Sequence, residues 1–125
     1  MSEKFFLQQA PFVVPTTDGK LIEEHVGRIA TDETNLSVAH MVAPPGWSEP
    51  HQNPEFDEYT LMVRGRKQIE INGETVTLKS GESLLVRKGV RVQYSNPFEE
   101  EAEYWSVCIP AFSPESVNRE NDSST

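Results

Sequence analysis

The chain has 125 residues and a formal net charge of -9, with 20 acidic side chains against 11 basic ones. This length suits one domain with its own core, and the negative charge opposes binding to nucleic acid or to anionic membrane surfaces. The single cysteine excludes an intrachain disulfide, and no apolar run approaches the roughly 20 residues of a membrane span or forms a secretory leader. We therefore expect a soluble, cytoplasmic protein whose partner is a small molecule or another protein.

Short segments with strand character recur along the chain between glycine, proline and asparagine residues. Over residues 1–34 we expect strands or an arm that packs on the main body of the domain. The body follows over 35–112, with expected strands at 36–42, 59–63, 67–71, 75–78, 84–87, 90–94 and 104–109. Because nothing between them has the helical period, the pattern predicts an all-β sandwich or barrel.

Two local signals sharpen this prediction. Asn72-Gly73 lies between two expected strands and is typical of a tight hairpin turn that needs positive φ. Near the end, Ser113 can cap a helix, Pro114 fits its first turn, and Glu115 favours the positive end of its dipole. We therefore expect a short helix over 114–119 within a final segment, 113–125, that ends in a polar tail, and we assign all three segments to one domain.

A first motif begins in a proline-flanked loop and ends in a turn. It contains Gly46, a single histidine at His51, a carboxylate at Glu58 and a second glycine at Gly65. These positions resemble the first motif of the cupin family, with one residue fewer between Gly46 and His51 and with Asn53 in place of the family's second histidine.

A second motif follows at the family spacing. Gly81, Gly89 and Asn96 match it, whereas Arg87 replaces its proline and Val92 replaces its histidine. The resemblance covers roughly residues 35–110 and implies a double-stranded β-helix barrel, usually a dimer, with a site in the barrel mouth. It does not imply one reaction, because cupins include dioxygenases, decarboxylases, isomerases, epimerases, sensor domains and storage proteins, so function must be argued from the site.

The motif positions bear on metal binding. In metal-bearing cupins, three histidines and a glutamate hold the ion, whereas this chain keeps only His51 and Glu58, with an amide at Asn53 and a hydrocarbon at Val92. Two good ligands do not make a metal cage, so we expect no metal and no other cofactor. The alternative is a metal enzyme in which His51, Asn53, Glu58 and an unseen fourth donor hold the ion.

Strand periodicity identifies the candidate site residues. With a period of two, Glu58, Thr60 and Met62 share one face, which lines the lumen if the resemblance holds. A carboxylate in a partly apolar lumen is a candidate acid, base or ligand anchor. The alternative is a structural ion pair between this carboxylate and one of three arginines, Arg64, Arg87 or Arg91.

In the second motif, Val92 and Tyr94 share one face of their strand. We expect Glu58 and Tyr94 as catalytic groups, and a second set of residues in ligand binding: His51 at the mouth, Asn53, Thr60, Met62 and Val92. The alternatives are ordinary core packing for Val92 and Tyr94 and an exposed loop position for His51.

Three functions fit these residues. The favoured one is a small-molecule-binding cupin with its site in the barrel lumen, with metal-independent isomerase, epimerase or lyase activity as its catalytic form. The second is a metal-dependent dioxygenase or isomerase, and the third is a non-catalytic ligand-sensing or interaction module.

The opposite strand face predicts a partner. Tyr59, Leu61 and Val63 point away from the lumen, and an apolar outer face on a small barrel needs covering. A homodimer would cover it. Cys108 lies between apolar residues in mid-strand, and we expect a buried, inert thiol there.

Overall fold

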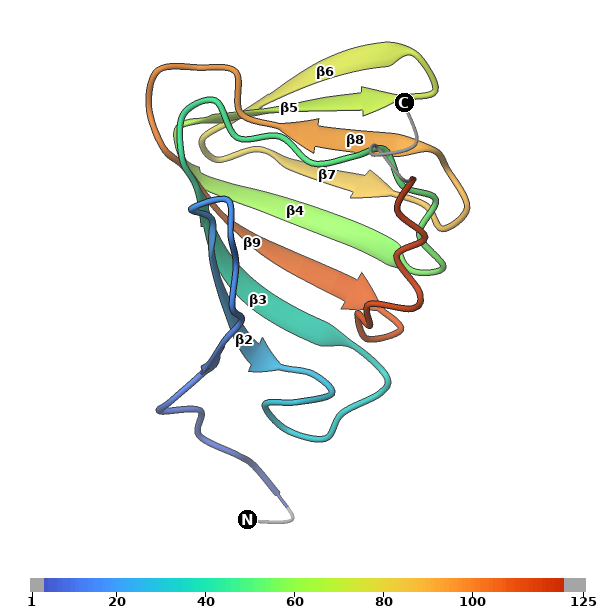
Figure 1. Ribbon diagram of the computed structural model, residues 1–125. Helices are drawn as coiled ribbons and strands as arrows, with labels where there is room; N and C mark the ends of the chain where they lie inside the picture. Colours follow the sequence, from blue (N-terminus) through green and yellow to red (C-terminus); the bar gives the residue numbers. More distant parts are fainter. Residues whose placement is uncertain (1–3, 121–125) are drawn as a thin grey trace.

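The computed structural model describes residues 4–120, which form two antiparallel sheets that face each other around a barrel interior (Figure 1). In spatial order, the six strands of the larger sheet are β1 (Phe12–Val13), β2 (Leu21–Val26), β3 (Ser37–Ala43), β9 (Ala102–Ile109), β4 (Asp57–Arg64) and β7 (Ser83–Val86). The smaller sheet contains β6 (Glu74–Lys79), β5 (Arg66–Ile71) and β8 (Val92–Ser95). The all-β prediction is confirmed.

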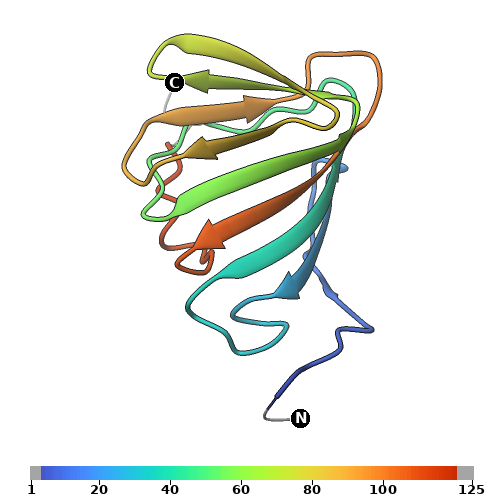
Figure 2. The same ribbon diagram turned by 180° about the vertical axis from the view of Figure 1, so that it is seen from behind.

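The amino-terminal part adds β1 and β2 to the edge of the larger sheet, where β2 pairs with β3. Seen from behind, the arm before β1 runs away from both sheets (Figure 2). Three apolar side chains on this arm are exposed: Phe5, Phe6 and Leu7. Within the part of the chain that the structure describes, no helix is long and apolar enough to cross a membrane.

Two predicted turns have the expected geometry. Asn72 and Gly73 both have positive φ, 49° and 85°, and close the β5–β6 hairpin. Gly65, with φ of 78°, lies where the chain leaves β4 for β5. A Cβ at Gly65 would collide with the backbone carbonyl oxygen of Glu101, so the motif glycine is required both by its φ and by this close approach.

The helix predicted over 114–119 is wrong. Residues 114–116 form a single turn, closed by a hydrogen bond from the Ser116 amide to the Ser113 carbonyl. The Ser116 carbonyl then accepts a hydrogen bond from the Glu55 amide, and Asn118 has positive φ, 51°. Tertiary hydrogen bonds and a left-handed residue thus replace the bonds that a helix would need.

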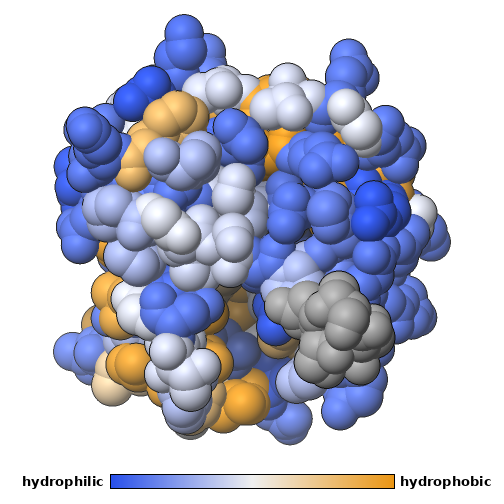
Figure 3. Space-filling view, turned by 45° about the horizontal axis from the view of Figure 1, so that its top comes forward, coloured by the Kyte–Doolittle hydropathy of each residue, from blue (hydrophilic) through white to orange (hydrophobic). Residues whose placement is uncertain are grey.

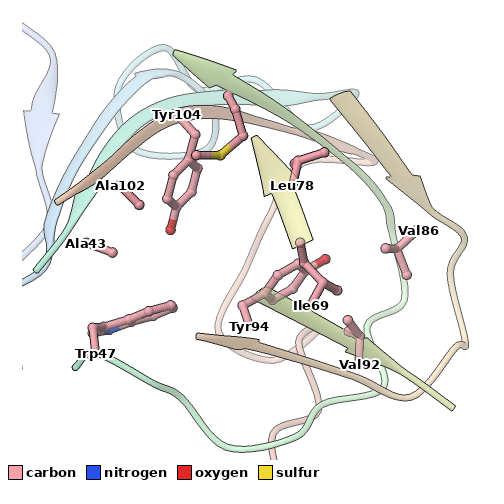
Figure 4. Close-up of a cluster of buried hydrophobic side chains, with 10 residues drawn as sticks. Ala43, Trp47, Ile69, Leu78, Val86, Val92, Tyr94, Ala102 and Tyr104 are labelled. Atoms are coloured by element: carbon pink, nitrogen blue, oxygen red, sulfur yellow. The ribbon is translucent and has the colours of Figure 1, made fainter. Parts of the chain in front are cut away.

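Side chains from both sheets pack together in the part of the barrel interior that Figure 4 shows, here called the inner end of the barrel. The buried cluster consists of Ala43, Trp47, Met62, Ile69, Leu78, Val86, Val92, Tyr94, Ala102 and Tyr104. The predicted alternation on β4 is confirmed: Glu58, Thr60 and Met62 are buried. On the other face of the same strand, Leu61 and Val63 are 44% and 47% exposed.

The motif asparagine, Asn96, is fully buried and ties the loops at this end of the barrel together. Its side-chain amide donates hydrogen bonds to the carbonyls of Ala43, Pro44 and Glu100, and its oxygen accepts one from the Phe98 amide. One side chain therefore binds three carbonyls and one amide and holds the segments before Trp47 and after Asn96 together.

Candidate functional site

A cavity of about 680 Å³ opens along the inner face of the larger sheet. Its walls come from β1, β2, β3, β4 and β9, from the loops before and after β2, and from residues 49–56 and 112–119. Apolar side chains form much of the wall, among them Phe12, Val14, Ile22, Met41, Phe56 and Phe112. Most of the face seen in Figure 3 is hydrophilic, and apolar side chains gather in the lower part of that view. The volume lies in the range of about 300–1,000 Å³ that is typical of small-molecule sites.

Glu58 brings a carboxylate into this wall. Its side chain projects from the inner face of β4 and is 9% exposed as a residue. The hydroxyl of Ser106, on the inner face of the adjacent β9, donates a 2.6 Å hydrogen bond to Oε2 of Glu58. Ser106 thereby fixes the direction of the carboxylate.

The three arginines considered as partners of Glu58 are engaged elsewhere. Among the described residues, Arg64 contacts Glu101 and Glu103, Arg87 contacts Asp57, and Arg91 contacts Glu120. All three lie on the surface, where such pairs contribute little to stability. A structural ion pair between Glu58 and one of these arginines is therefore not what the structure shows.

Two lysines lie inside the barrel. Lys67, on β5, is 1% exposed, and its Nζ lies 3.7 Å from the ring centre of Tyr104 and 4.2 Å from that of Tyr94. Burial, reinforced by the charge of Lys20, lowers the pKa of Lys67 to about 7, against the opposing effect of Glu58 and Glu49. At neutral pH the Lys67 amine is therefore close to its own titration point.

Lys20 precedes β2 and is 8% exposed. Its Nζ lies 4.1 Å from the ring centre of Trp47, whose Nε1 donates a 2.8 Å hydrogen bond to Asp18. Burial lowers the pKa of Lys20, and the carboxylates of Glu49, Glu58 and Asp18 oppose that shift. The lysine ammonium is thus held near several carboxylates.

Glu49 and Arg119 are further charged residues of the cavity wall, as are Glu24 and Arg28. Nη2 of Arg119 lies 3.3 Å from Oε2 of Glu49, and Nε of Arg119 donates a 3.4 Å hydrogen bond to Gln52. Burial raises the pKa of Glu49, although Lys20 and Arg119 oppose the shift. The cavity wall thus holds four carboxylates, Asp18, Glu24, Glu49 and Glu58, and two arginines, Arg28 and Arg119, and the buried Lys20 and Lys67 act on Glu49 and Glu58 from the barrel interior.

The other predicted site residues do not line this cavity. Thr60, Met62, Val92 and Tyr94 are all buried, and the last three belong to the core cluster at the inner end of the barrel. Figure 4 shows Val92 and Tyr94 in the barrel interior, and none of the four residues is among those that line the cavity.

His51 and Asn53 lie outside the interior. Nε2 of His51 lies 3.2 Å from Oε1 of Glu70, which occupies the face of β5 opposite to Lys67. Asn53 is exposed and donates a 3.3 Å hydrogen bond to the Gly89 carbonyl. Neither residue reaches the cavity.

The residues at the motif positions do not fit the metal that the motif implies. His51 and Asn53 point away from Glu58, and the position of the missing histidine holds the packed side chain of Val92. Over residues 4–120, no three His, Cys, Asp or Glu side chains come together in a group that could hold a metal ion. The residues at the motif positions therefore offer too few donors at one point to hold a metal ion.

The sequence did not point to three residues that line the cavity, Gln52, Ser106 and Arg119, or to two buried lysines inside the barrel, Lys20 and Lys67. For two of them, the alternation of inward and outward side chains along a strand indicates that the residue is buried. Lys67 alternates with the inward-facing Ile69 and Ile71, and Ser106 lies between Tyr104 and Cys108 on the buried face of β9. For Lys20 and Arg119, which lie outside strands, the sequence offers no such signal.

The chain is similar to a family model and to several curated proteins. A family model described as "Cupin domain" matches residues 39–109. The chain is 47% identical over 108 residues to endoribonuclease YbeY of Myxococcus xanthus, covering 86% of this chain and 37% of that protein. It is 33% identical over 64 residues to tetracenomycin polyketide synthase protein TcmJ of Streptomyces glaucescens, covering 50% and 43%. The chain thus spans less than half the length of each of these curated relatives.

Among solved structures, a Streptomyces PAC13 variant with uridine superimposes with a TM-score of 0.75, over 96% of this chain and 92% of that one. The two sequences are 13% identical, so this likeness shows the fold alone.

Proposed function

Because this chain belongs to the cupin family, we propose that it binds a small organic molecule in the cavity between β2, β3, β4 and β9, with Glu58 as the polar anchor. The apolar walls would take the carbon frame of the ligand, and the carboxylate would fix its orientation. The likeness to TcmJ, a polyketide synthase protein, supports a small organic molecule as the ligand class.

A single observation carries this proposal: Glu58 is buried in the cavity wall without a cation in direct contact among the described residues. A buried carboxylate is unfavourable unless hydrogen bonds or opposite charge compensate it. Ser106 occupies Oε2, and the other described hydroxyl that acts on the carboxylate, that of Tyr94, has no partner at hydrogen-bond geometry. A hydroxyl or amine of a ligand would supply the missing donor.

The test is the variant Glu58→Gln, screened beside the wild-type protein against small organic compounds that carry one hydroxyl or amine on an apolar frame. We expect compounds that raise the wild-type melting temperature to lose about tenfold or more in affinity, measured by calorimetry, because hydrogen bonds to a charged group are stronger than those to a neutral one. Glu70→Gln is the matched control, since Glu70 lies outside the interior. Unchanged binding together with a higher melting temperature in Glu58→Gln would mean that the carboxylate is structural.

A catalytic form of this function is favoured by Lys67. The Lys67 amine, with a pKa of about 7, can gain or lose a proton near neutral pH, and the charge of Glu58 acts on it. This pair suits a metal-independent isomerase, epimerase or lyase. Product formation that is lost in both Glu58→Gln and Lys67→Met would support the enzyme, whereas binding without any product would support a ligand-sensing module.

We do not extend the ribonuclease activity named for the Myxococcus protein to this chain. The chain spans 37% of that protein, and its net charge of -9 opposes an RNA backbone. The acidic groups around the cavity oppose a phosphate ligand for the same reason.

We also propose that a second copy of the chain covers the outer face of β4 and β9. Leu61, Val63 and Ile109 are each more than two-fifths exposed on this face. The charged side chains at the edge of this face are paired within the chain: Glu103 contacts both His40 and Arg64. A face without unpaired charge suits association between two copies of an acidic chain, which would otherwise repel each other.

A further inference from the structure

The loop between β2 and β3 contributes two exposed side chains to the cavity wall. Arg28 and Ile29 both line the cavity, and both are exposed, Ile29 by 65%. Figure 1 shows this loop at the same end of the larger sheet as the segment that follows β9. The two side chains are therefore accessible both to solvent and to a molecule in the cavity.

A buried carboxylate holds this loop in place. Glu24, on the inner face of β2, is 8% exposed, and its Oε2 accepts hydrogen bonds of 3.0 and 2.7 Å from the amides of Ile29 and Ala30. The Thr31 hydroxyl closes the loop through hydrogen bonds with the amide and the carbonyl of Gly27. A Cβ at Gly27 would lie 2.8 Å from Cδ of Glu24, so the glycine leaves room for the carboxylate. The backbone of the loop is thus fixed against the cavity wall.

Arg28 is a cation of this wall without an acid beside it. It makes no hydrogen bond or ion pair with another residue of the range 4–120. Arg119, the other arginine of the wall, lies 3.3 Å from Glu49. The carboxylate of Glu24 is taken by the backbone amides of the loop. The wall therefore contains one guanidinium whose donors are free for a ligand.

The charge of the surroundings selects the kind of ligand group. A guanidinium presents parallel N–H groups that match two oxygens of a carboxylate or of a phosphate. Four carboxylates line the same cavity and the chain has a net charge of -9, so they repel a phosphate, with close to two negative charges, more strongly than a carboxylate with one. A carboxylate is therefore the anion that this wall favours.

Arg28 and Glu58 lie at the same end of the larger sheet, and β3 and β9 separate their strands. One row of paired residues crosses the sheet beside both positions: Val26, Val38, Val107 and Tyr59. Three steps from strand to strand place the two positions about 14 Å apart along the curved sheet. Between them, the paired residues Ser37 and Cys108 line the cavity with small side chains. These small side chains leave space for a flat apolar frame between the guanidinium and the carboxylate.

We propose that the ligand of this cavity is an apolar carboxylic acid that carries a hydroxyl or an amine at its far end. The Arg28 guanidinium binds the carboxylate, and Glu58 accepts a hydrogen bond from the far end, as in the proposed function on which this inference rests. Ile29, next to Arg28 in the wall, contacts the apolar frame. Arg28 is thus a specificity-determining residue that selects acids over neutral compounds of the same shape.

The test uses three probes on one frame: para-hydroxyphenylacetate, its methyl ester, and phenylacetate, which lacks the hydroxyl. Calorimetry at low ionic strength measures their affinities for the wild-type protein and for Arg28→Gln. We expect the wild-type protein to bind the hydroxy acid about fivefold more tightly than the ester, as an ion pair at an exposed arginine allows, and Arg28→Gln to lose this preference. Added salt should weaken the preference too, because it screens an exposed pair.

Arg87→Gln is the matched control, since Arg87 is exposed and lies outside the cavity, and it should keep the preference for the acid. Because Arg28 is exposed, Arg28→Gln should keep the wild-type melting temperature. A second variant, Glu58→Gln, should weaken the binding of the hydroxy acid but not that of phenylacetate, which has no donor for Glu58.

The outcomes separate the two proposals. Equal binding of acid and ester by the wild-type protein, or a preference for the acid that survives in Arg28→Gln, overturns the inference about Arg28. The proposed function stands in that case if Glu58→Gln still weakens the binding of the hydroxyl compounds. Failure of all three probes to bind the wild-type protein overturns this inference together with the proposed function.

Discussion

On a typical sheet the inner face is the more apolar one, but on β4 and β9 the inner face carries several polar side chains and the outer face exposes apolar ones. The inner face carries Glu58, Thr60 and Ser106, all buried, whereas the outer face exposes Leu61 and Val63. In most small β-proteins apolar side chains face inward and polar ones outward. The inversion is what the two proposals require: a polar group on the inner face for a ligand, and an apolar outer face for a second copy of the chain.

The inverted pattern is local. On the smaller sheet, Ile69, Leu78 and Val92 point inward and are almost fully buried, as in an ordinary core. The smaller sheet thus supplies packing, and Lys67 is its one charged contribution to the interior among the described residues of β5, β6 and β8. The larger sheet supplies most of the polar groups of the interior, and its inner face is therefore less apolar than that of the smaller sheet.

The largest effect should come from placing the same charge on the two faces of β4. Met62→Lys puts an unpaired ammonium into the core cluster and should lower the free energy of unfolding by about 4 kcal/mol. Leu61→Lys, one residue earlier on the outer face, should change the stability of a single protomer by no more than about 0.5 kcal/mol. Urea denaturation at low protein concentration measures both values, and equal losses would contradict the assignment of the two faces.

Leu61→Lys has a second expected consequence, since the proposed second copy covers this residue. Sedimentation should show a dimer for the wild-type protein and a monomer for the variant. Thr77→Lys, exposed on the smaller sheet, is the control and should leave the dimer intact. A wild-type monomer at high concentration would contradict the proposal that the outer face pairs with a second copy.

A smaller effect of opposite sign is expected from Lys67→Met, which removes the buried amine. The pKa of Lys67 falls from its usual 10.5 to about 7 on folding, so between these values the unfolded chain binds more protons and wild-type stability rises with pH. Below pH 7 both states are protonated and the full penalty for the buried ammonium applies.

The Lys67→Met substitution should therefore raise the melting temperature by about 5 °C at pH 6 and by less at pH 10, as expected for ~1 kcal/mol in a small domain. Thermal unfolding of both proteins across this pH range checks the prediction. Lys79→Met, at an exposed position, should show no such dependence. A gain that grows with pH would show that Lys67 is not a buried, destabilising cation.

The smallest effect concerns His40 on the outer face. Its Nδ1 lies 2.9 Å from Glu23 and its Nε2 lies 2.8 Å from Glu103. Burial alone would lower the pKa of His40, but the hydrogen bonds to Glu103 and Glu23 outweigh burial and raise it above 6.5.

A raised histidine pKa contributes stability that is fully present below pH 6.5 and is lost as pH rises through the folded value. His40→Gln should therefore lower stability by about 1 kcal/mol or less at pH 5.5 and have little effect at pH 9. Urea midpoints at the two pH values test this. His25→Gln is the comparison variant: the His25 ring lies tilted against Trp105, 5.0 Å between ring centres, and its loss removes no ion pair between described residues.

The strand pattern predicted the fold because turn residues carry geometric requirements that are visible in sequence. Gly65 and Asn96 are examples: one avoids a collision, and the other satisfies four backbone groups. Alternation on β4 then placed Glu58 on the buried face. The helix over 114–119 failed because tertiary hydrogen bonds, which sequence does not display, take the backbone groups that it needed.

The rest of the site could not be predicted from single residues. A lysine is usually exposed, so Lys67 offers no warning of burial by its type. The placement of His51 depends on the bridge between Gln52 and Val92, which directs Gln52 inward and its neighbour outward. Such pairing between distant segments sets which of two adjacent side chains enters the barrel.

One further property of the wall offers a practical handle. Cys108 is the sole cysteine of the chain, and it lines the same cavity as Glu58. Burial raises the pKa of its thiol, so alkylating reagents should modify it slowly at neutral pH. The modification rate, read by mass spectrometry, would then report occupancy: any compound that fills the pocket should shield the sulfur, which turns an inert side chain into a built-in sensor for ligand screening.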